Sequence, residues 1–194
     1  MEKSIFITGD VFQIPLPSNL GFAYATGIDL ISVNESSNYP TLLRVFNFRS
    51  LEKMKTFSTD FDLVLCPLLI AGIHQVLKKK KWDIVGKIEL KQEDLRIPDY
   101  KKNDLGIWYY VSDSDISTKK ATNFNNVKHL ETLGAIGAEI VNTKIAMALL
   151  KDEEKKISDY FKLDSYFERH FYEDIIEIPT YYKQSDEIKG KALR

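Results

Sequence analysis

The chain has 194 residues, of which 44% are hydrophobic, 28% charged and 12% aromatic. This composition excludes a largely disordered protein, and the length predicts a single domain over residues 1–194 that buries a core of its own. Lys and Arg number 27 and Asp and Glu 28, so a net charge of −1 provides no overall attraction to nucleic acid or to an anionic membrane.

The N-terminus and the cysteine content predict a cytoplasmic protein. Residues Met1–Ser4 run directly into strand-like sequence and lack the apolar stretch and cleavage site of a signal peptide. No apolar run approaches the roughly 18 residues of a membrane-spanning helix. Cys66 is the only cysteine and lies in the apolar run Val64–Ile70, so we expect it to behave as a small hydrophobic residue.

Short strands are predicted near the N-terminus, where β-branched and aromatic residues are interrupted by proline, glycine and asparagine. In the first strand, Phe12, Ile14 and Leu16 form an apolar face and the alternate residues a mixed one. We expect these strands to form a meander that closes into a small β-barrel. The predicted strands are Val11–Leu16, Phe22–Thr26, Ile28–Val33 and Leu42–Phe48.

The middle of the chain continues this pattern after a polar loop at Asn34–Pro40 and a helical turn at Ser50–Lys55. The run Val64–Ile70 is apolar on both faces and fits a buried strand or the start of a buried helix. Alternating and aromatic residues then predict two further strands. These are Trp82–Ile88 and Leu105–Val111, the second followed by a turn at Asp113–Ser117.

Helical periodicity replaces strand periodicity after Asn126, where apolar residues recur at spacings of three to five. This predicts a long helix over Val127–Leu150, with a break near the glycines left open, and a second over Glu153–Phe171. Strands followed by helices indicate the α+β class, with a strongly twisted antiparallel sheet or an SH3-like β-barrel and C-terminal helices packed on it. Residues 1–125 are expected to be mainly β, 126–175 mainly helical, and 176–194 an acidic, aromatic tail.

The sequence predicts no enzyme, no cofactor and no metal. His74, His129 and His170 are far apart and have no cysteine pair to join them. No glycine-rich phosphate loop and no nucleophile motif is present. Asp113 and Asp115 are spaced like the start of a calcium loop, but the required glycine and glutamate do not follow.

One segment stands out by charge, the stretch from Asp164 to Glu187, with seven acidic residues against two basic ones and several aromatic rings among them. Aromatic rings supply contact area and carboxylates speed the encounter with a basic partner. The alternative, that half of the rings face the core and the acids only solubilise the tail, fits equally well. The predicted partner-binding residues are Asp164, Tyr166, Glu168, Tyr172, Glu173, Asp174, Glu177, Tyr181 and Tyr182.

Three motifs in order along the chain resemble a known family. They are Gly9–Leu16 (GDVFQIPL) followed by Gly21–Ala25, then Trp82–Gly86 (WDIVG), then Leu95–Tyr100 (LRIPDY). Over roughly residues 8–110 they are similar to the immunity protein 26 family of bacterial polymorphic toxin systems. The resemblance implies a cytoplasmic antidote that binds a cognate toxin domain and blocks it stoichiometrically, without catalytic residues. Many such toxins are nucleases with a basic cleft, which the acidic segment would fit.

A second hypothesis is a nucleic-acid-binding protein or small ribonuclease built on an SH3-like barrel. Its contact site would be the run Lys78–Lys81 beside Trp82. Acidic residues return at once after this run, which favours a solvated turn, and the balanced charge and missing acid–base pair count against the hypothesis. The expected partner is therefore a toxin domain rather than nucleic acid or a membrane, and the oligomeric state is left open.

Overall fold

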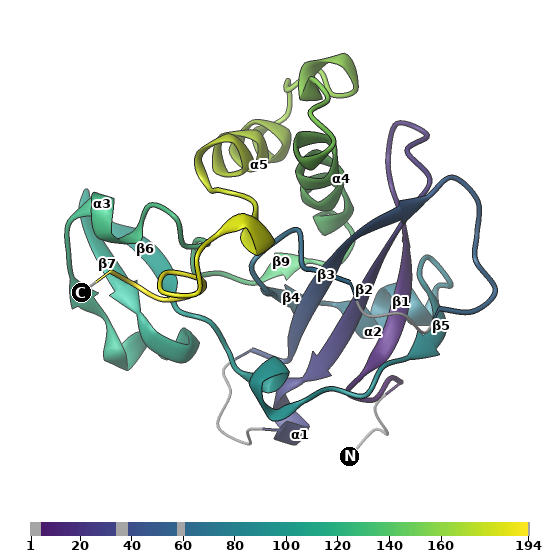
Figure 1. Cartoon of the computed structure of the whole chain (residues 1–194), viewed down its shortest axis with the longest axis horizontal. Coiled ribbons are helices and arrows are strands. Elements are labelled where there is room, and N and C mark those ends of the chain that lie inside the picture. Colours follow the sequence, from purple (N-terminus) through teal and green to yellow (C-terminus); the bar gives the residue numbers. More distant parts are fainter. Residues whose placement is uncertain (1–4, 34–38, 58–60, 194) are drawn as a thin grey trace.

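The computed structural model describes residues 5–33, 39–57 and 61–193, and it is an α+β structure with two sheets (Figure 1). The larger sheet has the order β5–β1–β2–β3–β4–β9, and its neighbouring strands are antiparallel except for the parallel pair β4–β9. Its strands are β1 (Asp10–Pro15), β2 (Phe22–Asp29), β3 (Thr41–Ser50), β4 (Leu68–Ala71), β5 (Asp83–Lys87) and β9 (Ile136–Gly137).

This sheet is open, because β5 and β9 form its two edges and do not pair with each other. The closed barrel expected from the strand pattern is therefore not found in the part of the chain that the structure describes. The twisted antiparallel meander β1–β2–β3 is the part of that expectation that the residues do form. The polar loop expected at Asn34–Pro40 falls mostly outside the described residues.

The alternation predicted for the first strand is confirmed. Phe12 and Ile14 of β1 are fully buried on the side that the helices cover, and Val11 is buried on the opposite side. The two strands expected at 22–26 and 28–33 are instead one strand, β2, followed by the short helix α1 (Leu30–Val33). Gly27 allows the strand to continue, because a Cβ at this position would lie 2.5 Å from the Phe12 ring.

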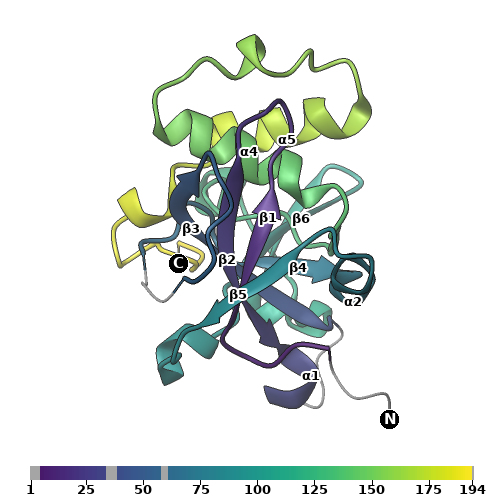
Figure 2. The same cartoon turned by 90° about the vertical axis from the view of Figure 1, so that its right-hand side faces the viewer.

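Helices α4 (Val141–Asp152) and α5 (Tyr166–Glu177) pack side by side and cover one face of the larger sheet, together with α2 (Ile73–Lys78) (Figure 2). The helix expected from Val127 begins only at Val141. The residues before it bond elsewhere: Leu133 N–H donates to the Lys101 carbonyl and Ala138 N–H to the Ala71 carbonyl. Strand pairing therefore overrides the helical spacing of the apolar residues, which leaves only the short helix α3 (Phe124–Val127) and β9 in this stretch.

The second predicted helix, Glu153–Phe171, also begins too early in the sequence. The structure has a single 3-10 turn at Ile157–Asp159 and then Leu163 with φ of 60°, a backbone conformation that no α-helix contains. Ser165 caps α5 by accepting a hydrogen bond from the Glu168 N–H. The helix ends at Glu177, two residues before Pro179. The helical turn expected at Ser50–Lys55 is absent, since β3 extends to Ser50 and residues 51–57 contain no helix.

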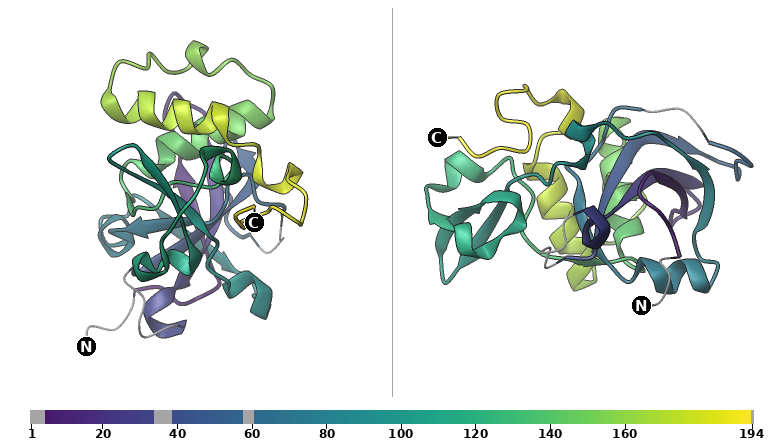
Figure 3. Two further views of the ribbon diagram at one scale, coloured as in Figure 1. Left: turned by 90° about the vertical axis from the view of Figure 1, so that its left-hand side faces the viewer. Right: turned by 90° about the horizontal axis from the view of Figure 1, so that it is seen from below.

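The smaller sheet stands to one side of the larger one (Figure 3). Its strands, in the order β6–β7–β8, are β6 (Tyr100–Asp104), β7 (Ile107–Val111) and β8 (Lys120–Ala121). Two 3-10 turns, Ser112–Ser114 and Ile116–Thr118, lie where the turn was expected. Helix α3 packs on this sheet through Phe124, whose ring centroid lies 4.7 Å from that of Trp108.

The C-terminal segment joins the two sheets. After the 3-10 turn Tyr181–Lys183, it runs from the larger sheet towards the smaller one (Figure 1). Tyr181 N–H donates to the Val64 carbonyl, and Asp99 N–H donates to the Gly190 carbonyl. Further along, Leu193 N–H donates to the Asn126 carbonyl beside the smaller sheet. Residues 179–193, called the tail below, therefore form a structural link between the sheets.

Candidate partner-binding surfaces

The exposed side of α5 presents aromatic rings. Tyr166 and Phe167 are 74% and 52% exposed, far more than aromatic residues in a protein core. The Tyr166 ring lies 5.6 Å from Phe167 and is stacked on His170 at 6.1 Å between centroids. These three residues form one continuous aromatic surface on the first two turns of the helix.

Carboxylates surround this aromatic surface. Asp164 and Glu173 are exposed and Glu168 is half-buried. Among the residues that the structure describes, none of these three forms an ion pair, so their charge is available to a partner. Part of the acidic surface predicted from the sequence therefore exists, and it lies on the outer side of α5.

A mainly apolar groove of about 230 Å³ lies between α5 and the segment that leads into β9. Its α5 wall includes Tyr166, Phe167 and Phe171. The opposite wall includes Gly134 and Gly137, and a Cβ at Gly134 would meet nothing within 4 Å. The lack of a side chain at Gly134 and Gly137 leaves room next to the rings for a side chain of a partner, and we call this feature the α5 groove.

The floor of the α5 groove is a buried ion cluster. Lys144 of α4 is 2% exposed, and its Nζ lies 2.6 Å from Glu131 Oε2 and 3.2 Å from Asp174 Oδ2. Burial alone would lower the pKa of Lys144, but the two carboxylates outweigh it and the pKa lies above its ordinary value. Asp174, predicted as a partner-binding residue, is thus buried with Lys144 and acts within the fold.

The remaining predicted residues do not join the aromatic surface. Tyr172 packs against the core between helices and sheet, and Glu177 lies 3.5 Å from the buried Lys101 ammonium. The Tyr182 hydroxyl donates to Asp152 at 3.0 Å. Tyr181 lies on the tail, in a separate cleft. The structure therefore brings together Asp164, Tyr166, Glu168 and Glu173 and separates the other five, while Phe167 and His170 are members that the sequence interpretation missed.

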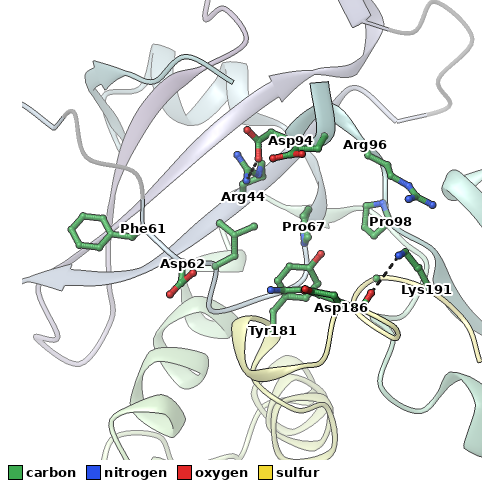
Figure 4. Close-up of a pocket in the computed structure, with 14 residues that line it drawn as sticks. Arg44, Phe61, Asp62, Pro67, Asp94, Arg96, Pro98, Tyr181, Asp186 and Lys191 are labelled. Carbon is green, nitrogen blue, oxygen red and sulfur yellow. Dashed lines mark hydrogen bonds and ion pairs between the residues drawn. The ribbon is translucent and has the colours of Figure 1, made fainter. Parts of the chain in front are cut away.

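The separate cleft is large and polar, with a volume of about 910 Å³, and we call it the tail cleft (Figure 4). One wall comes from β3 and the segment around Asp94, and the other from the tail. Arg44 of β3 is 8% exposed and its Nη2 lies 2.5 Å from Asp94 Oδ1. Its Nη1 is buried and has no hydrogen-bond partner among the residues that the structure describes. An unpaired buried donor of this kind costs roughly 1–3 kcal/mol.

The basic run Lys78–Lys81 does not form a nucleic-acid site with Trp82. The indole is 3% exposed and packs in the core, with its ring centroid 5.8 Å from Phe12. Lys79 and Lys81 pair with Glu139, at 3.6 and 2.7 Å. The ring is therefore unavailable for stacking on bases, and part of the charge is neutralised. Lys78–Lys81 lies at the end of α2 and in the turn before β5, as a solvated turn would.

The histidines and the cysteine have separate places in the structure. His129 is buried with its Nε2 2.7 Å from the Lys191 carbonyl oxygen, and His74 packs near Phe6. Cys66 is buried, and burial raises its pKa well above the usual value. No group of three His, Cys, Asp or Glu side chains that could hold a metal ion occurs within residues 5–33, 39–57 and 61–193. Over the same residues, no helix has the length and apolarity required to cross a bilayer.

Comparison with known proteins identifies the larger part of the chain. Neither a curated protein nor a solved structure matches it. A family model described as immunity protein 26 matches residues 7–121, from just before β1 to the end of β8. Helices α4 and α5 and the tail lie beyond the matched region. The match covers more than half of the chain and confirms the family indicated by the three sequence motifs, so the chain belongs to the immunity protein 26 family.

Proposed function

We propose that this protein is the antidote to a cognate bacterial toxin domain, which it binds and neutralises by covering the toxin's active cleft. Membership of an immunity protein family supports a toxin as the partner. Binding alone, without catalysis, is sufficient for this role. The proposed place of action is the cytoplasm, where the toxin would otherwise act.

The observation that carries the binding site is the exposed aromatic surface of α5. Tyr166, Phe167 and His170 present large rings to solvent beside the α5 groove. Exposed aromatic clusters next to a groove are typical of interface centres, where a few rings contribute most of the binding free energy. We assign the centre of the toxin interface to these rings.

The carboxylates around the rings indicate the chemistry of the partner. Asp164, Glu168 and Glu173 are not neutralised by any ion pair among the described residues, so they favour a basic surface. A nuclease cleft is basic because it binds phosphates. A nuclease is therefore the toxin class that this surface fits best, with the acids speeding encounter and the rings slowing dissociation.

The test is association with the toxin domain encoded by the neighbouring gene. Purified protein and toxin domain should form a 1:1 complex in size-exclusion chromatography, and one equivalent should abolish the toxin's activity. Absence of a complex at micromolar concentrations of both proteins would refute the proposed function.

Charge reversal tests the assigned surface. Replacing Asp164, Glu168 and Glu173 together by Lys should lower the association rate constant by about tenfold or more at low ionic strength, because steering by charge is lost. Glu52→Lys with Glu89→Lys is the control and is compared with the pair Glu168→Lys and Glu173→Lys, so that both variants reverse two charges; the control residues are exposed and distant in sequence from α5. Equal effects of the two variants would move the interface away from α5.

A further inference from the structure

The toxin-binding proposal makes no use of the tail cleft, although it is the larger cavity. We propose that the tail cleft is a binding site for a small organic oxyanion, a molecule that carries a phosphate or carboxylate group. The proposal goes beyond the toxin-binding function and is independent of it, because it concerns a different surface and is tested without any toxin.

The size of the site fits a small molecule. The tail cleft measures about 910 Å³ and adjoins a second hollow of about 810 Å³ across the tail, since Arg96 and Lys191 line both. Ligand pockets of roughly 300–1,000 Å³ are typical for metabolite-sized molecules. The tail cleft alone can therefore hold such a molecule.

Hydrogen-bond donors line both walls of the cleft: Arg44 and Arg96 lie on one side, and Tyr181 lies on the opposite side, on the tail (Figure 4). Burial is the main cause that raises the pKa of the Tyr181 hydroxyl, and Arg44 and Arg96 only partly oppose it. The hydroxyl therefore stays protonated and can donate. No hydrogen bond occupies it among the residues that the structure describes.

The two guanidinium groups are unequally occupied. Arg44 donates from Nη2 to Asp94, and its buried Nη1 has no acceptor within residues 5–33, 39–57 and 61–193. Arg96 is exposed at the entrance and forms no ion pair within the described part of the chain. The Lys189 ammonium lies 5.3 Å from the centre of the Tyr181 ring. No carboxylate of the described residues forms an ion pair with it. Arginine forks and a protonated hydroxyl are the donors that bind phosphate and carboxylate oxygens best.

The acidic residues of the cleft limit what can enter. Asp94 is neutralised by Arg44, whereas Asp62, Glu93 and Asp186 are exposed along the rim. A long polyanion such as RNA would have to pass these carboxylates with every phosphate, which is unfavourable. A single oxyanion meets fewer of these carboxylates than a polymer does, and this favours a small ligand over a nucleic acid.

Isothermal titration calorimetry of the full chain at fixed ionic strength tests the proposal. One arm uses inorganic pyrophosphate and AMP as phosphate probes, and the other uses citrate and succinate as carboxylate probes. We expect saturable binding in one arm with a dissociation constant below about 1 mM. The arm that binds identifies the group. No binding in either arm at concentrations of about 10 mM would overturn the proposal.

Two variants link binding to the cleft. Arg96→Ala and Tyr181→Phe should each weaken binding by about tenfold, because each removes a donor to the anion. Lys102→Ala, on the outer strand of the smaller sheet and not lining the cleft, is the control that keeps full affinity. Circular dichroism melting checks that all three variants fold. Unchanged affinity in both cleft variants would also overturn the proposal, whether or not the toxin binds.

Discussion

The α5 groove and the tail cleft differ in the way they are built. The α5 groove is small and apolar, and its exposed rings and acids come from one helix, Tyr166–Glu177, and the residues just before it. The tail cleft is about four times larger and polar, and its donors come from β3, the segment before β6 and the tail. An exposed aromatic surface suits a protein partner, whereas a polar cleft lined by arginine, lysine and tyrosine donors suits a small anion.

The largest expected effect tests whether the floor of the α5 groove is structural. Lys144→Met leaves Glu131 and Asp174 buried without a cation, which should lower the free energy of unfolding by about 3–5 kcal/mol. Urea denaturation measures the loss. Lys155→Met removes only an exposed pair with Glu153 and should cost less than about 1 kcal/mol. Similar losses in the two variants would contradict a structural role for the cluster.

The second prediction tests whether the rings of the groove bind the toxin without supporting the fold. Tyr166→Ala with Phe167→Ala should weaken toxin binding by roughly 2–4 kcal/mol, mainly through faster dissociation. Because both rings are largely exposed, the melting temperature should stay within a few degrees of the parent. Surface plasmon resonance and calorimetry separate the two quantities. An unfolded double variant would mean that the rings support the helix instead.

A third prediction concerns the ion pair that ties the helical layer to β3. Arg49 contacts Glu153 at 2.5 and 2.8 Å, and its hydrogen bond is the main cause that lowers the pKa of Glu153 to about 2 from 4.5. Because the pKa of Glu153 is lower in the folded than in the unfolded protein, its ion pair with Arg49 stabilises the fold above pH 4.5. This stabilisation is lost as the pH falls towards 2. The pair is partly exposed, so solvent screening limits it to about 0.5–1 kcal/mol.

Glu153→Gln checks this dependence. The difference in unfolding free energy between parent and variant should be constant above pH 4.5 and shrink below it. Neither toxin affinity nor anion affinity should change, because Glu153 lines neither the groove nor the cleft. A difference that grows on acidification would show that the pKa of Glu153 is raised, and not lowered, by folding.

The last prediction concerns a turn outside both sites. Leu105 is 99% exposed at the turn between β6 and β7, with φ of 50°, and Gly106 follows with φ of 87°. Leucine is unfavourable at positive φ, whereas asparagine tolerates it. Leu105→Asn should therefore raise the unfolding free energy by about 0.5–1 kcal/mol, measured by thermal melting, and leave both binding activities unchanged. A loss of stability would mean that the turn has another conformation in solution.

Local patterns in the sequence predicted the strands of the meander and the family. The alternation at Phe12 and Ile14 reports burial directly, so the faces of β1 were correct. The helix expected from Val127 failed because apolar spacing cannot reveal that Leu133 and Ala138 pair with distant strands. Buried strands and buried helices both contain many apolar residues. Whether such a segment becomes a strand or a helix depends on the distant segments with which its backbone forms hydrogen bonds.

For the candidate sites too, local sequence patterns predicted some features, whereas features that depend on distant contacts were missed. The exposed rings of α5 are neighbours in sequence, so composition alone singled out the segment Asp164–Glu187 that contains them, but it left open whether the rings face the core. Asp174 has the same residue type as Asp164, and nothing local shows that it meets Lys144 in the core. No pattern in the sequence indicated the tail cleft, because Arg44, Arg96 and Tyr181 are far apart along the chain and line one cleft only after folding.

The tail that links the two sheets makes the cleft sensitive to local unfolding. Its Tyr181 amide is bonded to the larger sheet and its Leu193 amide lies beside the smaller one, so detachment of the tail would remove one wall of the cleft. A ligand held by Tyr181 and Arg96 would oppose that opening, and the protection would grow with the logarithm of its free concentration. Amide hydrogen exchange along residues 181–193 would then serve as a gauge of occupancy.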